Sequence, residues 1–145
     1  EFRMRRNTLV DYAKEIGLSL VVEGGYGLRP FLEAVGGDFD GRCPVCYRLR
    51  MRSAARYAAE NGFTHFTTTL LISPYQNHEL LAQTAREAAE EFGVSFLYRD
   101  FRPYFREGQD RARAMGLYMQ KYCGCIFSEE DRYRKRKKPP KKEEA

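Results

Sequence analysis

Short apolar segments alternate with helical segments along this chain, and this alternation restricts its fold more than any other feature. The apolar segments are rich in Leu, Val, Ile, Phe and Thr, as strands covered on both faces are. They are residues 18–22, 63–72 and 94–98. The expected helices are residues 4–16, 30–35, 44–61, 78–92 and 105–115. We therefore predict an α/β fold, a Rossmann-like open sheet of mainly parallel strands with flanking helices.

Polar side chains follow two of the expected strands. Thr67, Thr68 and Thr69 end the strand expected from Phe63, which runs into Leu70–Ile72 and is followed by Ser73, and Asp100 follows the third strand. In open α/β sheets, ligands bind beyond the carboxyl ends of the strands. The sequence therefore predicts a ligand site at this edge, where loops and helix starts can also bring cysteines.

The four cysteines fall into two tight pairs, Cys43 with Cys46 and Cys123 with Cys125. Paired thiols indicate a metal, an iron–sulfur cluster or a redox disulfide. No stretch approaches the roughly 20 apolar residues of a membrane helix, and no secretory leader is recognisable. We predict a cytoplasmic protein, in which a stable structural disulfide is not expected.

The first pair flanks the start of the predicted helix 44–61, with Pro44 at its first position. Unpaired N–H groups and the helix dipole favour thiolates there. Cys43 and Cys46 could bind one edge of an iron–sulfur cluster, an iron ion or a zinc ion, or could be buried structural cysteines.

The second pair has a single intervening residue, Gly124. A disulfide between Cys123 and Cys125 would close a small, strained ring that is easily reduced, and glycine supplies the backbone freedom for such a ring. This pair is suited to carry electrons. Alternatively, both thiolates complete a four-cysteine metal site with the first pair.

The net charge of +5 is carried by the last fifteen residues, which hold eight Lys or Arg and three acidic residues. We expect one α/β domain at residues 1–128 and a basic disordered tail at residues 129–145. The tail either keeps the protein soluble or attracts RNA phosphates. The two histidines, His65 and His78, are expected to be structural or solvated.

Four stretches together resemble one family, the QueH type of epoxyqueuosine reductase. They are Cys-x-x-Cys-Tyr at 43–47, Thr-Thr-Leu-Leu-Ile-Ser-Pro at 68–74, Tyr-Arg-Asp-Phe-Arg at 98–102 and Tyr-Cys-Gly-Cys-Ile-Phe-Ser at 122–128. The resemblance extends over residues 1–128. The family has a further cysteine motif ahead of the first helix, so we expect the catalytic domain in this sequence to be N-terminally incomplete.

The resemblance implies reduction of epoxyqueuosine to queuosine at the wobble position of tRNA, the final step of queuosine biosynthesis. It implies a cobalamin-independent mechanism that uses a [4Fe–4S] cluster and an external electron donor. An additional iron is a further option. Cys43 and Cys46 would be cluster ligands. Cys123 and Cys125 would be the redox-active pair or ligands of a further iron. No membrane partner is implied.

For the remaining roles the candidates are weaker. The proton donor is expected among Tyr75, Asp100 and Tyr122, and Arg99 and Arg102 are expected to contact the anticodon arm. Two aromatic residues, Tyr104 and Phe105, either hold unstacked bases or belong to the core. The competing hypotheses are a non-catalytic, zinc-stabilised RNA-binding module and a thiol–disulfide oxidoreductase.

Overall fold

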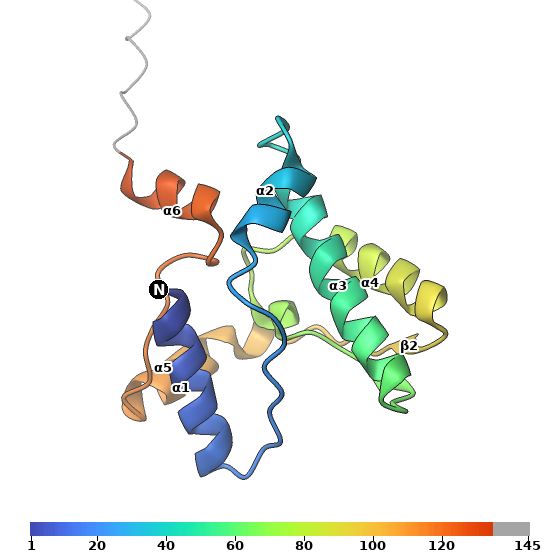
Figure 1. Cartoon of the computed structure of the whole chain (residues 1–145). Helices are drawn as coiled ribbons and strands as arrows, with labels where there is room; N and C mark the ends of the chain where they lie inside the picture. The colour runs from blue at the N-terminus through green and yellow to red at the C-terminus, as the bar shows by residue number, and fades with distance from the viewer. Residues whose placement is uncertain (135–145) are drawn as a thin grey trace, which may run out of the picture. The chain divides into compact units, whose positions relative to one another are not determined.

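The structure is a computed structural model that describes residues 1–134 of the chain (Figure 1). These residues divide into two compact units. One is Val22–Leu117, and the other combines Glu1–Val21 with the segment that begins at Tyr118. The first cysteine pair lies in the larger unit and the second pair in the smaller one.

The larger unit contains helices, two short strands and two 3₁₀ turns. In chain order these are α2 (Leu28–Val35), α3 (Arg42–Glu60), β1 (His65–Phe66), η1 (Thr69–Ile72), α4 (His78–Phe92), β2 (Ser95–Phe96), η2 (Arg102–Tyr104) and α5 (Phe105–Ala114). The helices predicted in this unit are thus all present, with ends shifted by a few residues.

Strands β1 and β2 are parallel, with His65 opposite Ser95 and Phe66 opposite Phe96. Because α4 connects them, this segment is a βαβ unit, and the α/β character of the prediction is confirmed. The extended Rossmann-like sheet is not: among residues 1–134 the sheet has two strands.

One expected strand segment and the end of another take other conformations. Residues 18–22 form an exposed connection, because no strand in the described part of the chain lies beside them to satisfy their backbone groups. Residues 69–72 form the 3₁₀ turn η1. The Thr68 side chain accepts a hydrogen bond from the Leu70 N–H and starts this turn, which buries Leu71 completely.

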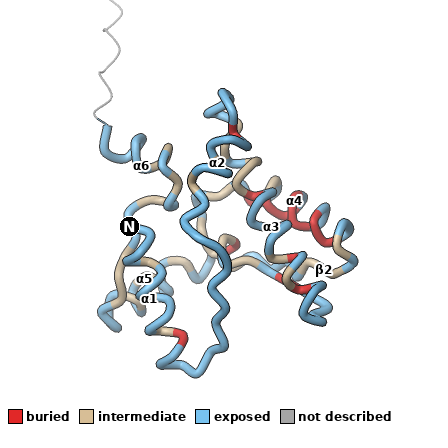
Figure 2. The backbone as a smooth tube through the Cα atoms, viewed as in Figure 1, coloured by how far each residue is buried: buried red, intermediate tan, exposed pale blue. Residues whose placement is uncertain are grey.

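The core lies between α3, α4 and the two strands. Figure 2 shows the buried residues concentrated along α4. The buried side chains of α3 are Tyr47, Met51, Ala55 and Ala58, which recur at helical spacing. Helix α4 contributes Leu81 and several alanines, and Gly93 ends it in the left-handed conformation. The small alanine side chains let these two helices pack closely.

The smaller unit contains α1 (Phe2–Glu15) and α6 (Ile126–Tyr133). Residues 129–133, the first part of the stretch predicted to be disordered, are therefore helical. Glu129 in the first turn of α6 and Arg132 in its last turn complement the helix dipole, and Arg134 pairs with Glu130. The remainder of the predicted tail, residues 135–145, lies outside the described residues.

Candidate functional site

Cys43 and Cys46 lie in the first turn of α3, which begins at Arg42 rather than at Pro44 as predicted. Proline is tolerated in this first turn, where N–H groups have no intrahelical acceptor. Cys43 is exposed and Cys46 is half-buried. Because they are three residues apart, both thiols lie on the same side of the helix. The first turn of α3 carries no acidic side chain to offset the positive end of the helix dipole.

Tyr47, the residue after Cys46, connects this helix start to the start of α4. Its ring is buried, and its hydroxyl donates to Gln76 Oε1 at 2.7 Å. The same hydroxyl accepts a hydrogen bond from the Asn77 N–H at 3.1 Å. The first cysteine pair therefore lies on a helix turn that is fixed against residues 76 and 77.

The loop 73–77 is held by further hydrogen bonds at both ends. Asn77 caps α4 by accepting from the Leu80 N–H at 3.1 Å. His78 Nε2 bonds to the Ser73 carbonyl at 3.1 Å, and Ser73 Oγ accepts from the Tyr75 N–H at 3.3 Å. His78 is buried, consistent with the structural role predicted for it, and within residues 1–134 its Nδ1 has no hydrogen-bond partner.

Of the polar residues predicted at the strand ends, Thr67 follows β1 directly and Asp100 comes four residues after the end of β2. Thr67 Oγ1 donates to the Leu97 carbonyl at 2.8 Å and ties the two strand ends together. Asp100 accepts hydrogen bonds from the backbone N–H and the guanidinium of Arg102. These bonds lower the pKa of Asp100 to about 2, so its carboxyl group is ionised at neutral pH.

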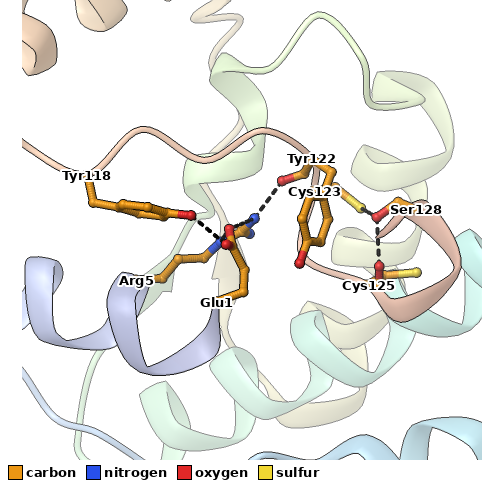
Figure 3. A network of polar contacts seen from close by, with 7 residues as sticks. All are labelled: Glu1, Arg5, Tyr118, Tyr122, Cys123, Cys125 and Ser128. Carbon is orange, nitrogen blue, oxygen red and sulfur yellow. Dashed lines mark hydrogen bonds and ion pairs between the residues drawn. The ribbon is translucent and has the colours of Figure 1, made fainter. Parts of the chain in front are cut away.

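In the smaller unit, Cys123 and Cys125 lie at the turn before α6 (Figure 3). The Cys123 thiol donates to Ser128 Oγ at 3.0 Å, and Ser128 Oγ donates to the Cys125 carbonyl at 2.8 Å. A hydrogen bond with Cys123 and partial burial raise the pKa of Cys125 above its ordinary value. None of the four cysteines forms a disulfide in this structure.

Arg5 of α1 holds the turn that contains the second pair, a role that no local pattern in the sequence indicates. Its guanidinium donates to the Tyr122 carbonyl at 2.7 Å and lies 5.1 Å from the centre of the Tyr122 ring (Figure 3). Glu1 pairs with Arg5, and the Tyr118 hydroxyl donates to Glu1. Partial burial and the nearby Glu129 carboxylate raise the pKa of Tyr122 to about 12.

Within residues 1–134, no three Cys, His, Asp or Glu side chains converge as a metal site. The two cysteine pairs belong to separate compact units. The donor chemistry fits an iron–sulfur cluster nevertheless, since each pair offers two thiols and Cys43 and Cys46 share one side of a helix N-terminus.

No helix in the described part of the chain is both long enough and apolar enough to cross a membrane.

Comparison with known proteins identifies one family. The family model described as "Epoxyqueuosine reductase QueH" matches residues 1–131, which include all four cysteines. A curated protein of that name from Dehalococcoides mccartyi is 34% identical over 139 residues, which are 96% of this chain and 76% of the relative. One from Thermotoga maritima is 31% identical over 138 residues, 88% of this chain and 71% of the relative.

Proposed function

Because this chain belongs to the epoxyqueuosine reductase QueH family, we propose that it reduces epoxyqueuosine in tRNA to queuosine, the final step of queuosine biosynthesis. The observation that carries this proposal is the family match over residues 1–131. The two relatives above have the same printed name, and about three quarters of each aligns with this chain. The protein is an oxidoreductase, and its substrate class is tRNA.

Cys43 and Cys46 are the proposed ligands of a [4Fe–4S] cluster. The exposure of Cys43, the spacing of three residues between the two cysteines and their place at the start of α3 support this role. When bound, such a cluster supplies electrons one at a time at low potential. The Tyr47 hydrogen bonds to Gln76 and Asn77 hold the helix turn in place and so keep the two thiols in position.

Cys123 and Cys125 are the proposed electron store for the reaction. Removing the epoxide oxygen as water takes two electrons and two protons, and two thiols release that number when they become a disulfide. The turn before α6 supports this role, since Ser128 bonds to both cysteines and Gly124 gives the backbone freedom that ring closure needs. Binding of a further iron by the same pair is the alternative within this proposal.

The proton donor is proposed to be a tyrosine. With its pKa at about 2, Asp100 has no proton to give at neutral pH and instead fixes Arg102. Tyr75 and Tyr122 remain as candidates, and Tyr122, with its pKa at about 12, keeps its proton over the whole neutral range. Arg99 and Arg102 are the proposed contacts to the anticodon arm.

Anaerobic purification and assay test the function directly. The purified protein is expected to be brown, to contain iron and acid-labile sulfide, and to convert epoxyqueuosine in tRNA to queuosine when a chemical reductant is supplied. Colourless protein with stoichiometric zinc that binds tRNA without turnover would instead establish the zinc-stabilised RNA-binding module.

Two cysteine variants separate the proposed roles. Cys43→Ser is expected to lose most of its iron and therefore its activity. Cys123→Ser is expected to keep its iron and its fold but lose turnover, because one thiol cannot store two electrons. Loss of iron from Cys123→Ser as well would assign the second pair to metal binding rather than to electron storage.

A further inference from the structure

Tyr75 is an unusual residue in the larger unit, because it is 84% exposed while the loop that carries it is held by hydrogen bonds on both sides. From this combination we infer that the Tyr75 ring, with Phe105 beside it, is a stacking surface for an unpaired nucleobase of the substrate RNA. The inference rests on the proposed function and adds the place at which the RNA is held.

The exposure of Tyr75 has no explanation in folding. A side chain that keeps most of its surface in water contributes little hydrophobic stabilisation. Its ring contacts Phe105 edge-on, with centroids 5.8 Å apart and planes at 83°. This contact sets the direction of the Tyr75 ring and leaves most of its surface accessible.

The backbone at Tyr75 is ordered before any ligand arrives. Its own N–H bonds to Ser73 Oγ, and the carbonyl of Ser73 bonds to the buried His78 ring. On the other side, Gln76 and Asn77 are bonded to the Tyr47 hydroxyl. A ligand that stacks on Tyr75 therefore does not have to order this loop, which is the main advantage of a preformed site.

The loop also lies beside the first cysteine pair. Gln76 follows Tyr75 and accepts a hydrogen bond from Tyr47, which itself follows Cys46. A base stacked on Tyr75 would thus be held close to the helix start where the cluster is proposed to bind. These residues all belong to the same compact unit.

Two arginines close to Phe105 in the sequence favour RNA as the occupant. Arg106 follows Phe105 in α5, and Arg99 lies over the Phe101 ring at 5.7 Å in the segment before it. Unpaired RNA bases are held by aromatic rings and arginines, and arginines also pair with phosphates. The reaction itself takes place on a base of the anticodon loop, where bases are unpaired.

Binding of a synthetic RNA hairpin with an unpaired loop of about seven nucleotides, the size of an anticodon loop, tests the inference. The proteins to compare are wild type, Tyr75→Ala, Tyr75→Phe and the control Phe63→Ala. Phe63 is a matched control because it is 57% exposed, has an aromatic partner in Tyr57 and precedes β1, whereas Tyr75 follows it. Fluorescence anisotropy at one fixed salt concentration gives each Kd.

We expect Tyr75→Ala to raise the Kd for the hairpin by about tenfold, the loss of one stacked base. Tyr75→Phe keeps the ring and is expected to bind like wild type, as is Phe63→Ala. A fully paired RNA duplex of the same length should show no difference among the four proteins, because its bases are not available for stacking.

Equal hairpin affinity of wild type and Tyr75→Ala would overturn the inference, even if the enzyme reduces epoxyqueuosine. So would a Tyr75→Phe variant as weak as Tyr75→Ala, since the hydroxyl and not the ring would then matter. Self-association of wild type that Tyr75→Ala abolishes would also overturn it, in favour of a protein contact. Failure of the proposed function has a different signature, since wild type would then bind the hairpin but would not reduce epoxyqueuosine.

Discussion

Gly124 shows how one residue determines the local geometry of the second cysteine pair. Its φ is +104°, a conformation that side chains other than glycine rarely adopt. A Cβ atom at this position would also collide with Nη1 of Arg5. The backbone conformation therefore requires glycine between the two thiols, and a side chain there would also displace the Arg5 guanidinium.

The first prediction concerns Gly124→Ala. We expect it to lower the free energy of unfolding by about 1 kcal/mol or more, because alanine is strained at this positive φ and its methyl group also displaces the Arg5 guanidinium. Gly25→Ala is the control, since Gly25 has ordinary φ and a methyl group there would meet no neighbouring atom. Urea denaturation measures stability, and the rate of thiol labelling reports the turn; equal behaviour of both variants would contradict the prediction.

The second prediction concerns Asp100 and pH. Its pKa is about 2 in the folded protein against an ordinary value of 3.8, so its pairing with Arg102 adds stability above pH 3.8. This contribution is lost as the pH falls from 3.8 through 2. Asp100→Asn should therefore lower the Tm by about 2 °C or less at neutral pH, because the pair is exposed. Once the pH is below the folded-state pKa of about 2, the two Tm values should converge; a constant difference would contradict the assignment.

At the residue scale, the sequence indicates the cysteines proposed for the reaction but not the residues that position them. The spacing of Cys43 and Cys46 and of Cys123 and Cys125 is visible directly. Arg5 was not predicted because its partner Tyr122 is 117 residues away in the chain. A residue whose role depends on so distant a contact leaves no local pattern.

At the element scale, the sequence predicts α1 to α5 well, misses α6 and predicts the strands poorly. In α3 and α4 the buried positions repeat every three or four residues, a signal that one helix carries by itself. A strand depends on a neighbour. Residues 18–22 have an apolar composition but no partner strand among the described residues, and residues 69–72 are held in a 3₁₀ turn by Thr68.

The third prediction tests the connection between α3 and the loop before α4. Tyr47→Phe removes the hydroxyl that donates to Gln76 and accepts from the Asn77 N–H. Two polar groups in a partly buried place then lose this partner, and we expect a loss of about 2 kcal/mol in unfolding free energy, measured by urea denaturation. Tyr57→Phe, which changes the same group on a half-buried tyrosine of the same helix, serves as the control.

If α3 carries the cluster ligands as proposed, Tyr47→Phe should also weaken the binding of iron. Loosening the turn that carries Cys46 is expected to lower iron retention under a chelator, with Tyr57→Phe retaining iron like wild type. A Tyr47→Phe variant with unchanged stability and unchanged iron would show that this hydroxyl does not support the site.

At the scale of the whole molecule, the cysteines are divided between two compact units. The smaller unit joins Glu1–Val21 to the segment from Tyr118 onward, so its assembly depends on residues from distant parts of the sequence. Local patterns predict the α1 helix but carry no information about this pairing. The proposed sharing of roles between the two cysteine pairs therefore rests on their chemistry, and the Cys43→Ser and Cys123→Ser comparison is its test.

Charge is the other property of the whole molecule that bears on a nucleic-acid substrate. Residues 135–145 hold six Lys or Arg and two Glu, so deleting them lowers the net charge from +5 to +1. If these cations neutralise tRNA phosphates, each contact contributes about 0.7 to 0.9 to the slope of log Kd against log salt. If they only keep the protein soluble, the slope is unaffected by the deletion.

The fourth prediction follows from that difference. Deletion of residues 135–145 should raise the Kd for tRNA at low salt and make binding less dependent on salt, with a slope lower by about 2 to 4. At about 0.5 M salt, where charges are strongly screened, the two proteins should converge, because the lost attraction is electrostatic. The effect on turnover should fall on KM, since the cysteines, the 73–77 loop and Arg5 all remain. An unchanged slope combined with earlier precipitation would assign these residues to solubility.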